Sequence, residues 1–142
     1  MPDLLANSWL ARLEGEGYRL TAPRRAIVEI LAATDTALGP LEVYDRARQC
    51  CPGVGLVTVY RTLEKLEETG LAQRVHQPGG CHRYLRAAEG HQHLLICTAC
   101  GRAQIFEGDD LDGFITNVAA RTGFAIRDHW LQLYGLCPKC KN

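Results

Sequence analysis

The 142-residue sequence contains no run of about 18 apolar residues, the length that a membrane-spanning helix requires. Its first residues also lack the basic segment and apolar core of a secretory signal peptide. We therefore expect a cytoplasmic protein with no membrane partner.

A net charge is also missing, because 16 Lys and Arg residues balance 16 Asp and Glu residues. This balance argues against a protein that coats nucleic acid by bulk charge, since such domains are usually basic. It leaves local basic contacts open. Internal repeats and low-complexity tracts are absent, and 46% of the residues are hydrophobic. We therefore expect a folded chain of one domain or two small ones.

Cysteine is the abundant chemical group, with seven residues. In a reducing compartment, such a number favours metal binding or redox chemistry over a disulfide framework. Two C-x-x-C pairs are separated by a long insert, and four thiolates so arranged are typical of structural Zn(II). Two redox dithiols or buried thiols are the alternative. The four residues are Cys97, Cys100, Cys137 and Cys140.

The first half has the periodicity of helices followed by a hairpin. Apolar residues recur at helical spacing over 3–16, and Thr21 is a predicted N-cap. Further helices are predicted from Gly39-Pro40 and over 56–69. Alternating residues over 71–76 and 81–85, around a Gly-Gly turn, then predict two antiparallel strands. Helix-turn-helix plus hairpin is the winged-helix plan, which we assign to residues 1–86.

The second half changes to strands. We expect a hinge at 87–91 and a small α/β domain at 92–142, with strands over 93–97, 103–106 and 130–134. A helix is predicted between Asp109-Asp110 and Gly123, and Phe124-Ala125-Ile126 is also β-like. The predicted fold class is α+β.

In this order, the motifs resemble those of the ferric uptake regulator family of metal-dependent bacterial transcription factors, most closely its zinc uptake regulator branch. The resemblance covers nearly the whole chain. It rests on Gly17-Tyr18-Arg19-Leu20-Thr21, Pro23-Arg24, Val57-Thr58-Val59-Tyr60-Arg61-Thr62-Leu63, Gly70-Leu71, the histidines before Cys97-x-x-Cys100-Gly101, His129, Leu133-Tyr134-Gly135 and Cys137-x-x-Cys140.

The resemblance implies a homodimer whose N-terminal winged helices bind a palindromic double-stranded DNA operator. Its C-terminal halves would pair and keep the structural zinc, and metal near the hinge would close the DNA-binding domains. Tyr60 would contact a base, Arg61 a phosphate or guanine edge, and Arg19 the minor groove or the adjacent backbone. Thr58 lies on the same predicted face, and Lys65 is a candidate phosphate contact.

The resemblance also implies a regulatory metal site of three histidines and one acid: His91, His93, Asp112 and His129. Three imidazoles and a carboxylate suit tetrahedral Zn(II), although Fe(II) or Mn(II) could also bind. The alternative is that the histidines are ordinary solvated or core residues.

At the hinge sensory site the sequence departs from the family pattern. Leu94 stands where a histidine is usual three residues before the first cysteine, and Gln92 stands two residues earlier. The other positions that match metal ligands of the family's hinge site hold Leu85, Ala37 and Ile105. Read without gaps, that site is lost.

A strand bulge before Cys97 would change this interpretation by moving His91 and His93 into the hinge site. Residues near the wing could then complete a second regulatory site. The candidates are His76, Cys81, His82 and Glu89.

We therefore expect a zinc-dependent repressor of zinc-uptake genes and not an enzyme. An iron- or peroxide-responsive regulator of the same family is the nearest alternative, and a C-x-x-C thiol-redox enzyme is the remote one. Cys50-Cys51-Pro52 resembles a haem-regulatory Cys-Pro dipeptide, but adjacent cysteines at a helix end are more often packing residues.

Overall fold

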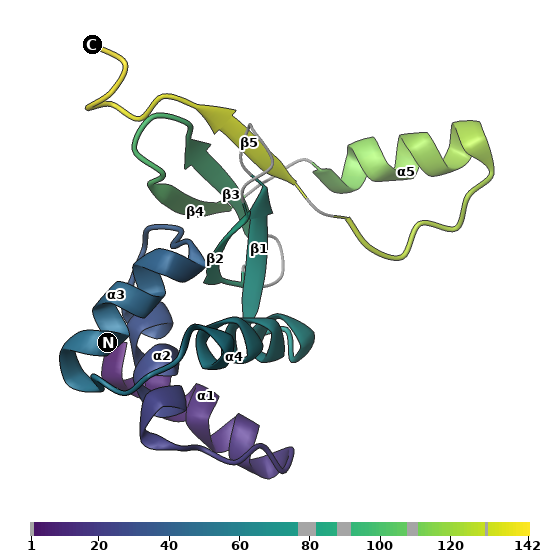
Figure 1. Cartoon of the computed structure of the whole chain (residues 1–142). Coiled ribbons are helices and arrows are strands. Elements are labelled where there is room, and N and C mark those ends of the chain that lie inside the picture. The colour runs from purple at the N-terminus through teal and green to yellow at the C-terminus, as the bar shows by residue number, and fades with distance from the viewer. Residues whose placement is uncertain (1, 77–81, 88–91, 108–110, 130) are drawn as a thin grey trace. The chain divides into compact units, whose positions relative to one another are not determined.

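The computed structural model describes residues 2–76, 82–87, 92–107, 111–129 and 131–142, and the chain divides into two compact units, Met1–Ala87 and Ala88–Asn142. Figure 1 shows a helical first unit that ends in a hairpin, and a second unit built on a small sheet. The α+β class is confirmed. Within the described residues, no helix combines the length and apolar character that a membrane span requires.

The first unit packs its helices around one apolar core. Thr21 caps the second helix by accepting a hydrogen bond from the Arg24 backbone N–H at 3.4 Å. The third starts at Gly39, whose N–H donates to the Glu42 side chain at 3.2 Å. The helices are α1 (Pro2–Gly15), α2 (Ala22–Ala33), α3 (Pro40–Cys50) and α4 (Leu56–Glu68).

Helix α4 buries one face and presents the other to solvent. Val59, Leu63 and Leu66 are fully buried in the core, as the 3.6-residue spacing predicts. Gly70, with φ +77°, ends the helix and turns the chain into the hairpin.

The hairpin pairs β1 (Ala72–His76) with β2 (His82–Arg86) in antiparallel register, Ala72 opposite Arg86 and His76 opposite His82. A third segment joins it, because Leu38 and Tyr84 exchange backbone hydrogen bonds of 2.9 and 2.8 Å. The predicted helix-turn-helix and hairpin are therefore both present in this unit.

The described residues of the second unit form a three-stranded sheet in the order β4-β3-β5. β3 (Gln92–Cys97) pairs antiparallel with β4 (Ala103–Glu107) and parallel with β5 (Gln132–Gly135). Helix α5 (Leu111–Thr122) connects β4 to β5 and buries none of its own residues within the chain. Residues 124–126, which we expected to be β-like, are irregular and exposed, since no strand of the sheet pairs with them.

Candidate metal centre and nucleic-acid interface

The four cysteines of the two C-x-x-C pairs meet at one end of the sheet. Parallel pairing of β3 and β5 sets Cys97 opposite Gly135, so the turns after both strands leave the sheet together. The four sulfurs all lie within 4.8 Å of one another, and Cys100 Sγ is 3.8 Å from Cys137 Sγ. Tetrahedral Zn(II) with Zn–S bonds of about 2.3 Å separates its sulfurs by about 3.8 Å. The residues therefore fit the structural zinc site that the spacing predicts.

Backbone groups around Cys97 favour its ionised form. The N–H groups of Cys100 and Cys137 donate to Cys97 Sγ at 3.5 and 3.4 Å. These bonds outweigh the effect of burial and lower the pKa of Cys97 to about 6. Without metal, the hydrogen bonds that the Cys140 thiol donates to the sulfurs of Cys137 and Cys97 raise the pKa of Cys140 to about 12. Cys97 is thus ionised more readily than an ordinary thiol, and metal binding has to displace the protons that the other cysteines keep.

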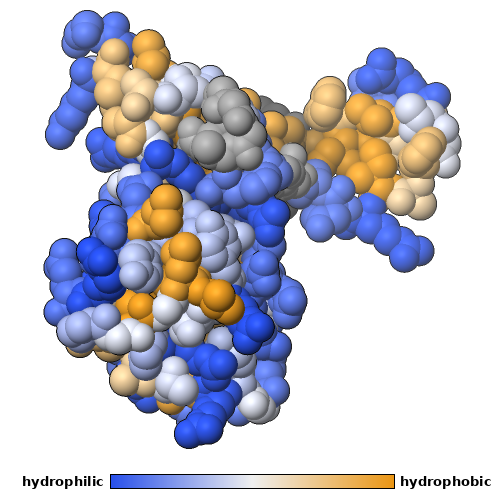
Figure 2. Space-filling model, in the orientation of Figure 1, coloured by the Kyte–Doolittle hydropathy of each residue, from blue (hydrophilic) through white to orange (hydrophobic). Residues whose placement is uncertain are grey.

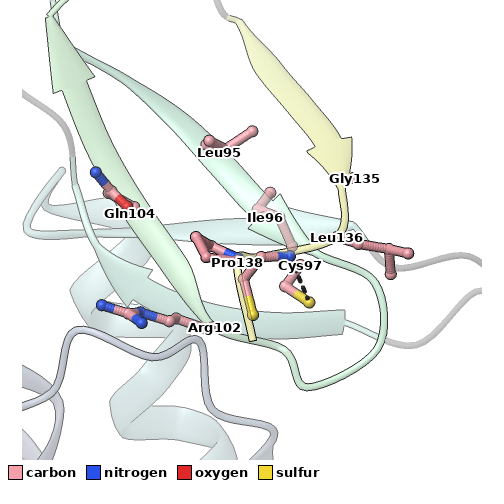
Figure 3. Close-up of a pocket in the computed structure, with 9 residues that line it drawn as sticks. Leu95, Ile96, Cys97, Arg102, Gln104, Gly135, Leu136 and Pro138 are labelled. Carbon is pink, nitrogen blue, oxygen red and sulfur yellow. Dashed lines mark hydrogen bonds between the residues drawn. The ribbon is translucent and has the colours of Figure 1, made fainter. Parts of the chain in front are cut away.

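A small apolar hollow of about 90 Å³ lies between this cysteine cluster and the strands. Figure 3 shows Leu95, Ile96, Leu136 and Pro138 around Cys97, with Gln104 on the neighbouring strand β4 and Arg102 just before it. Pockets for organic ligands usually measure roughly 300–1,000 Å³. The hollow therefore serves as apolar surroundings for the sulfurs and not as a substrate site.

Two of the four predicted regulatory ligands lie together. His93, on β3, is 3% exposed, and its ring centroid is 5.3 Å from that of His129. Asp112 is exposed in the first turn of α5. His91 lies outside the described residues. The structure therefore gives a buried imidazole and a half-buried one, side by side, as the centre of this candidate site.

A second pair of histidines lies on the hairpin. His76 and His82 are directly opposite in the β1–β2 register, and their ring centroids are 5.2 Å apart at an interplanar angle of 75°. Both side chains are exposed. Cys81 and Glu89, the other candidates for this second site, lie outside the described residues.

The exposed side of α4 carries the predicted DNA-contacting residues. Tyr60 is 43% exposed and Arg61 is exposed beside it, while Thr58 and Lys65 are half-buried on the same helix. Arg19 is exposed in the loop before α2. These residues therefore remain accessible to a large partner.

Sequence reasoning noted Tyr18 and Arg24 only as parts of a motif, and the structure places both in this surface. The Arg24 guanidinium lies 4.7 Å from the Tyr18 ring centroid and donates to the Arg19 carbonyl at 2.7 Å. The Lys65 ammonium lies 5.8 Å from the same ring. Tyr18 thus holds cationic groups from two segments near one aromatic ring. The sequence signal was the Tyr-Arg…Pro-Arg spacing around the Thr21 cap.

Comparison with known proteins agrees with this architecture. The profile of the "Ferric uptake regulator family" matches residues 15–134. The chain belongs to the ferric uptake regulator family. Its members are transcriptional regulators, so this chain is a metal-responsive regulator and not an enzyme. A thiol-redox enzyme, the remote alternative, is therefore excluded.

The relatives include proteins named as ferric uptake regulators and proteins named as zinc uptake regulators. The chain is 33% identical over 132 residues to a ferric uptake regulation protein of Legionella pneumophila, covering 92% of this chain and 96% of that one. It is 31% identical over 130 residues to a zinc uptake regulation protein of Mycobacterium tuberculosis, covering 92% and 100%. A zinc uptake regulator solved with zinc and DNA shares the fold, with a TM-score of 0.73 at 23% identity over 99% of this chain and 95% of that one.

The positions where this regulator departs from the family's hinge site are mostly apolar core. Leu94, Leu85 and Ala37 are at most 1% exposed, and Ile105 is half-buried. The proposed bulge before Cys97 is wrong, because β3 and β4 pair one to one from Gln92–Glu107 through Ile96–Ala103. No extra residue therefore shifts His93 along the strand, and Leu94 occupies a packed position that offers no metal ligand.

Proposed function

We propose that this protein is a homodimeric, zinc-responsive repressor that binds a palindromic operator and controls zinc-uptake genes. The supporting observations are the His93–His129 pair, which is separate from the four-cysteine site, and the apolar residues at the hinge-site positions. If the apolar hinge-site positions supply no metal ligands, the regulatory metal has to bind at the site that contains His93 and His129.

The DNA-binding part of the proposal rests on α4 and the surface around it. The helix precedes a hairpin, exposes Tyr60 and Arg61, and is flanked by the cationic groups near Tyr18. In winged-helix proteins such a helix enters the major groove, where an aromatic ring can meet a thymine methyl and arginine can meet guanine or phosphate. Arg19 and Lys65 would add backbone contacts that set the register.

The homodimer is supported by apolar surface on the second unit. Phe114 of α5 is 62% exposed, Phe124 is 74% exposed, and Leu136 is 53% exposed. Figure 2 colours much of α5 as apolar surface. Such a helix gains its stability from a surface outside its own chain, and a second copy supplies one. Two copies related by a two-fold axis would present two α4 helices to a palindromic site.

The regulatory site would be completed by His91 and Asp112 around the His93–His129 pair. Neutral imidazole suits Zn(II), and three imidazoles with one carboxylate fill a tetrahedron. Zn(II) would act by binding the DNA-competent arrangement of the dimer more tightly than the others, which shifts the population toward it. The hairpin pair His76–His82 is the candidate for a second regulatory site, with Cys81 and Glu89 as its further ligands.

An iron- or peroxide-responsive regulator is the second candidate, and the ferric uptake relatives favour it by name. Peroxide sensing needs Fe(II) in a carboxylate-rich, open site, and the apolar hinge positions argue against that. Operator-binding titrations in buffered Zn(II), Fe(II) and Mn(II) separate the candidates. Zn(II) is expected to activate binding at the lowest free concentration, and activation by Fe(II) alone would exclude the zinc assignment.

A further inference from the structure

Two adjacent cysteines, Cys50 and Cys51, take no part in the metal and DNA sites described above. Cys50 is the last residue of α3, and Cys51 follows as its C-cap. Both are free thiols; Cys50 is exposed and Cys51 is half-buried against the helical core. We propose that the two form a chelating dithiol for a trivalent arsenic centre, and that its occupation weakens DNA binding.

The number and type of the ligand atoms determine which centre the two cysteines can bind. The described residues contain one group of three or more candidate metal ligands, the four zinc-site cysteines, so no third described ligand accompanies this pair. Two thiols alone leave a Zn(II) tetrahedron half empty. A monosubstituted trivalent arsenical needs only two thiolates and is a soft centre that prefers sulfur.

The two thiols lie close enough to interact. The thiol of Cys50 donates to the Ala47 carbonyl at 3.4 Å, and its sulfur accepts from the thiol of Cys51. Burial, followed by this contact, raises the pKa of Cys51. Two thiols within reach of each other suit the bent S–As–S angle of pyramidal arsenic(III) better than a linear two-coordinate ion.

Space for the substituent on arsenic lies next to the pair. An open depression of about 480 Å³ is lined by Gln49 and Pro52, the residues on either side of the two cysteines, and by Asp45 and Arg48 of α3. The reaction is balanced without an oxidant. Two S–H bonds and the As=O bond of R–As=O are replaced by two As–S bonds and one water molecule, and arsenic stays trivalent.

Arsenic bound to the two cysteines would affect α4 through the short connection between α3 and α4. The Cys51 N–H donates to the Ala47 carbonyl at 2.8 Å, and the Cys51 carbonyl accepts from Val54 at 3.0 Å. Val54 is buried, and the next residue, Gly55, is the N-cap of α4. An arsenic atom on the half-buried Cys51 has to displace this cap, which moves the start of the DNA-contacting helix. This step rests on the proposed function, whereas the binding itself does not.

The test uses the full-length zinc-loaded protein and phenylarsine oxide, with intact-mass measurement and zinc analysis. We expect one arsenical per chain, with the structural zinc kept and the adduct removed by a dithiol but not by excess monothiol. Cys50→Ser and Cys51→Ser should each lose the adduct, while Cys81→Ser, the matched single-thiol control, should keep it. A dithiol-sensitive adduct on the Cys50→Ser/Cys51→Ser double variant, or no adduct on the wild type, would overturn the site.

Operator affinity is then measured on the same samples. Untreated protein must bind first, which tests the proposed function separately. The adduct is expected to weaken binding at least several-fold, with recovery after dithiol treatment and no effect on either serine variant. Unchanged affinity of the modified wild type would overturn the coupling to α4.

Discussion

Arg74 on β1 and Glu67 on α4 form a two-pronged ion pair, with Nε–Oε2 and Nη2–Oε1 distances that are both 3.0 Å. The Arg74 guanidinium also lies 5.6 Å from the ring centroid of Tyr84 on β2. The side chains are 33% and 34% exposed, so solvent screens the pair only in part. The pair thus ties the proposed recognition helix to both strands of the hairpin.

We expect Glu67→Gln to weaken operator binding because it releases the hairpin from α4. Loss of the charge-assisted pair is worth on the order of 1 kcal/mol, which corresponds to about fivefold in affinity. Glu68→Gln removes the same charge from the adjacent, exposed position and serves as the control. Equal effects of the two variants would show that net charge, and not the ion pair, is responsible.

Tyr60→Ala should weaken binding to the specific operator by about tenfold, the loss of one base contact. Non-specific DNA binding and metal content should stay unchanged, because Tyr60 is exposed and touches neither metal site. Tyr60→Phe keeps the ring that would meet a thymine methyl, so it should bind nearly as well as the wild type. A strong defect in Tyr60→Phe would assign the contact to the hydroxyl group instead.

His93→Gln should raise the free Zn(II) needed for operator binding by at least about tenfold, since it removes a proposed ligand. The cysteine-bound zinc should remain. His76→Gln is the parallel variant for the hairpin pair, and comparison of the two zinc titrations shows which histidine pair senses. A normal titration for His93→Gln would remove this residue from the regulatory site.

Cys97→Ser should abolish the tightly held zinc and unfold the second unit, because all four sulfurs share one site and Cys97 is its buried member. Dimerisation should be lost with it, while the helical first unit keeps its own core. Zinc analysis and sedimentation check both effects, with Cys50→Ser as the control thiol substitution. A zinc-loaded dimer of Cys97→Ser would contradict the structural assignment.

The helices, the hairpin and the cysteine site could be predicted from local signals: the Thr21 cap, the apolar face of α4 and the C-x-x-C spacing. The register around Leu94 could not. A one-residue slip turns every side chain of a strand to the other face, and two consecutive leucines at 94 and 95 suit either face. Pairing with β4 and β5 decides the register, and those partners are distant in sequence.

The apolar residues of 124–126 misled the strand prediction for a related reason. Phe124 and Ile126 alternate as strand residues do, yet they are 74% and 37% exposed in the chain. Alternation indicates where apolar side chains are needed but not which surface covers them. In the proposed dimer, that surface belongs to the second copy.

In the proposed mechanism, zinc bound at the His93–His129 site controls DNA binding. The most direct test of this mechanism is an operator titration of zinc-loaded wild type and His93→Gln at buffered free Zn(II), with Fe(II) and Mn(II) in parallel. We expect Zn(II) to activate wild-type binding at the lowest concentration, and His93→Gln to shift only this response while it keeps its cysteine-bound zinc. Operator binding that is independent of Zn(II), or that Fe(II) activates equally well in both proteins, would contradict it.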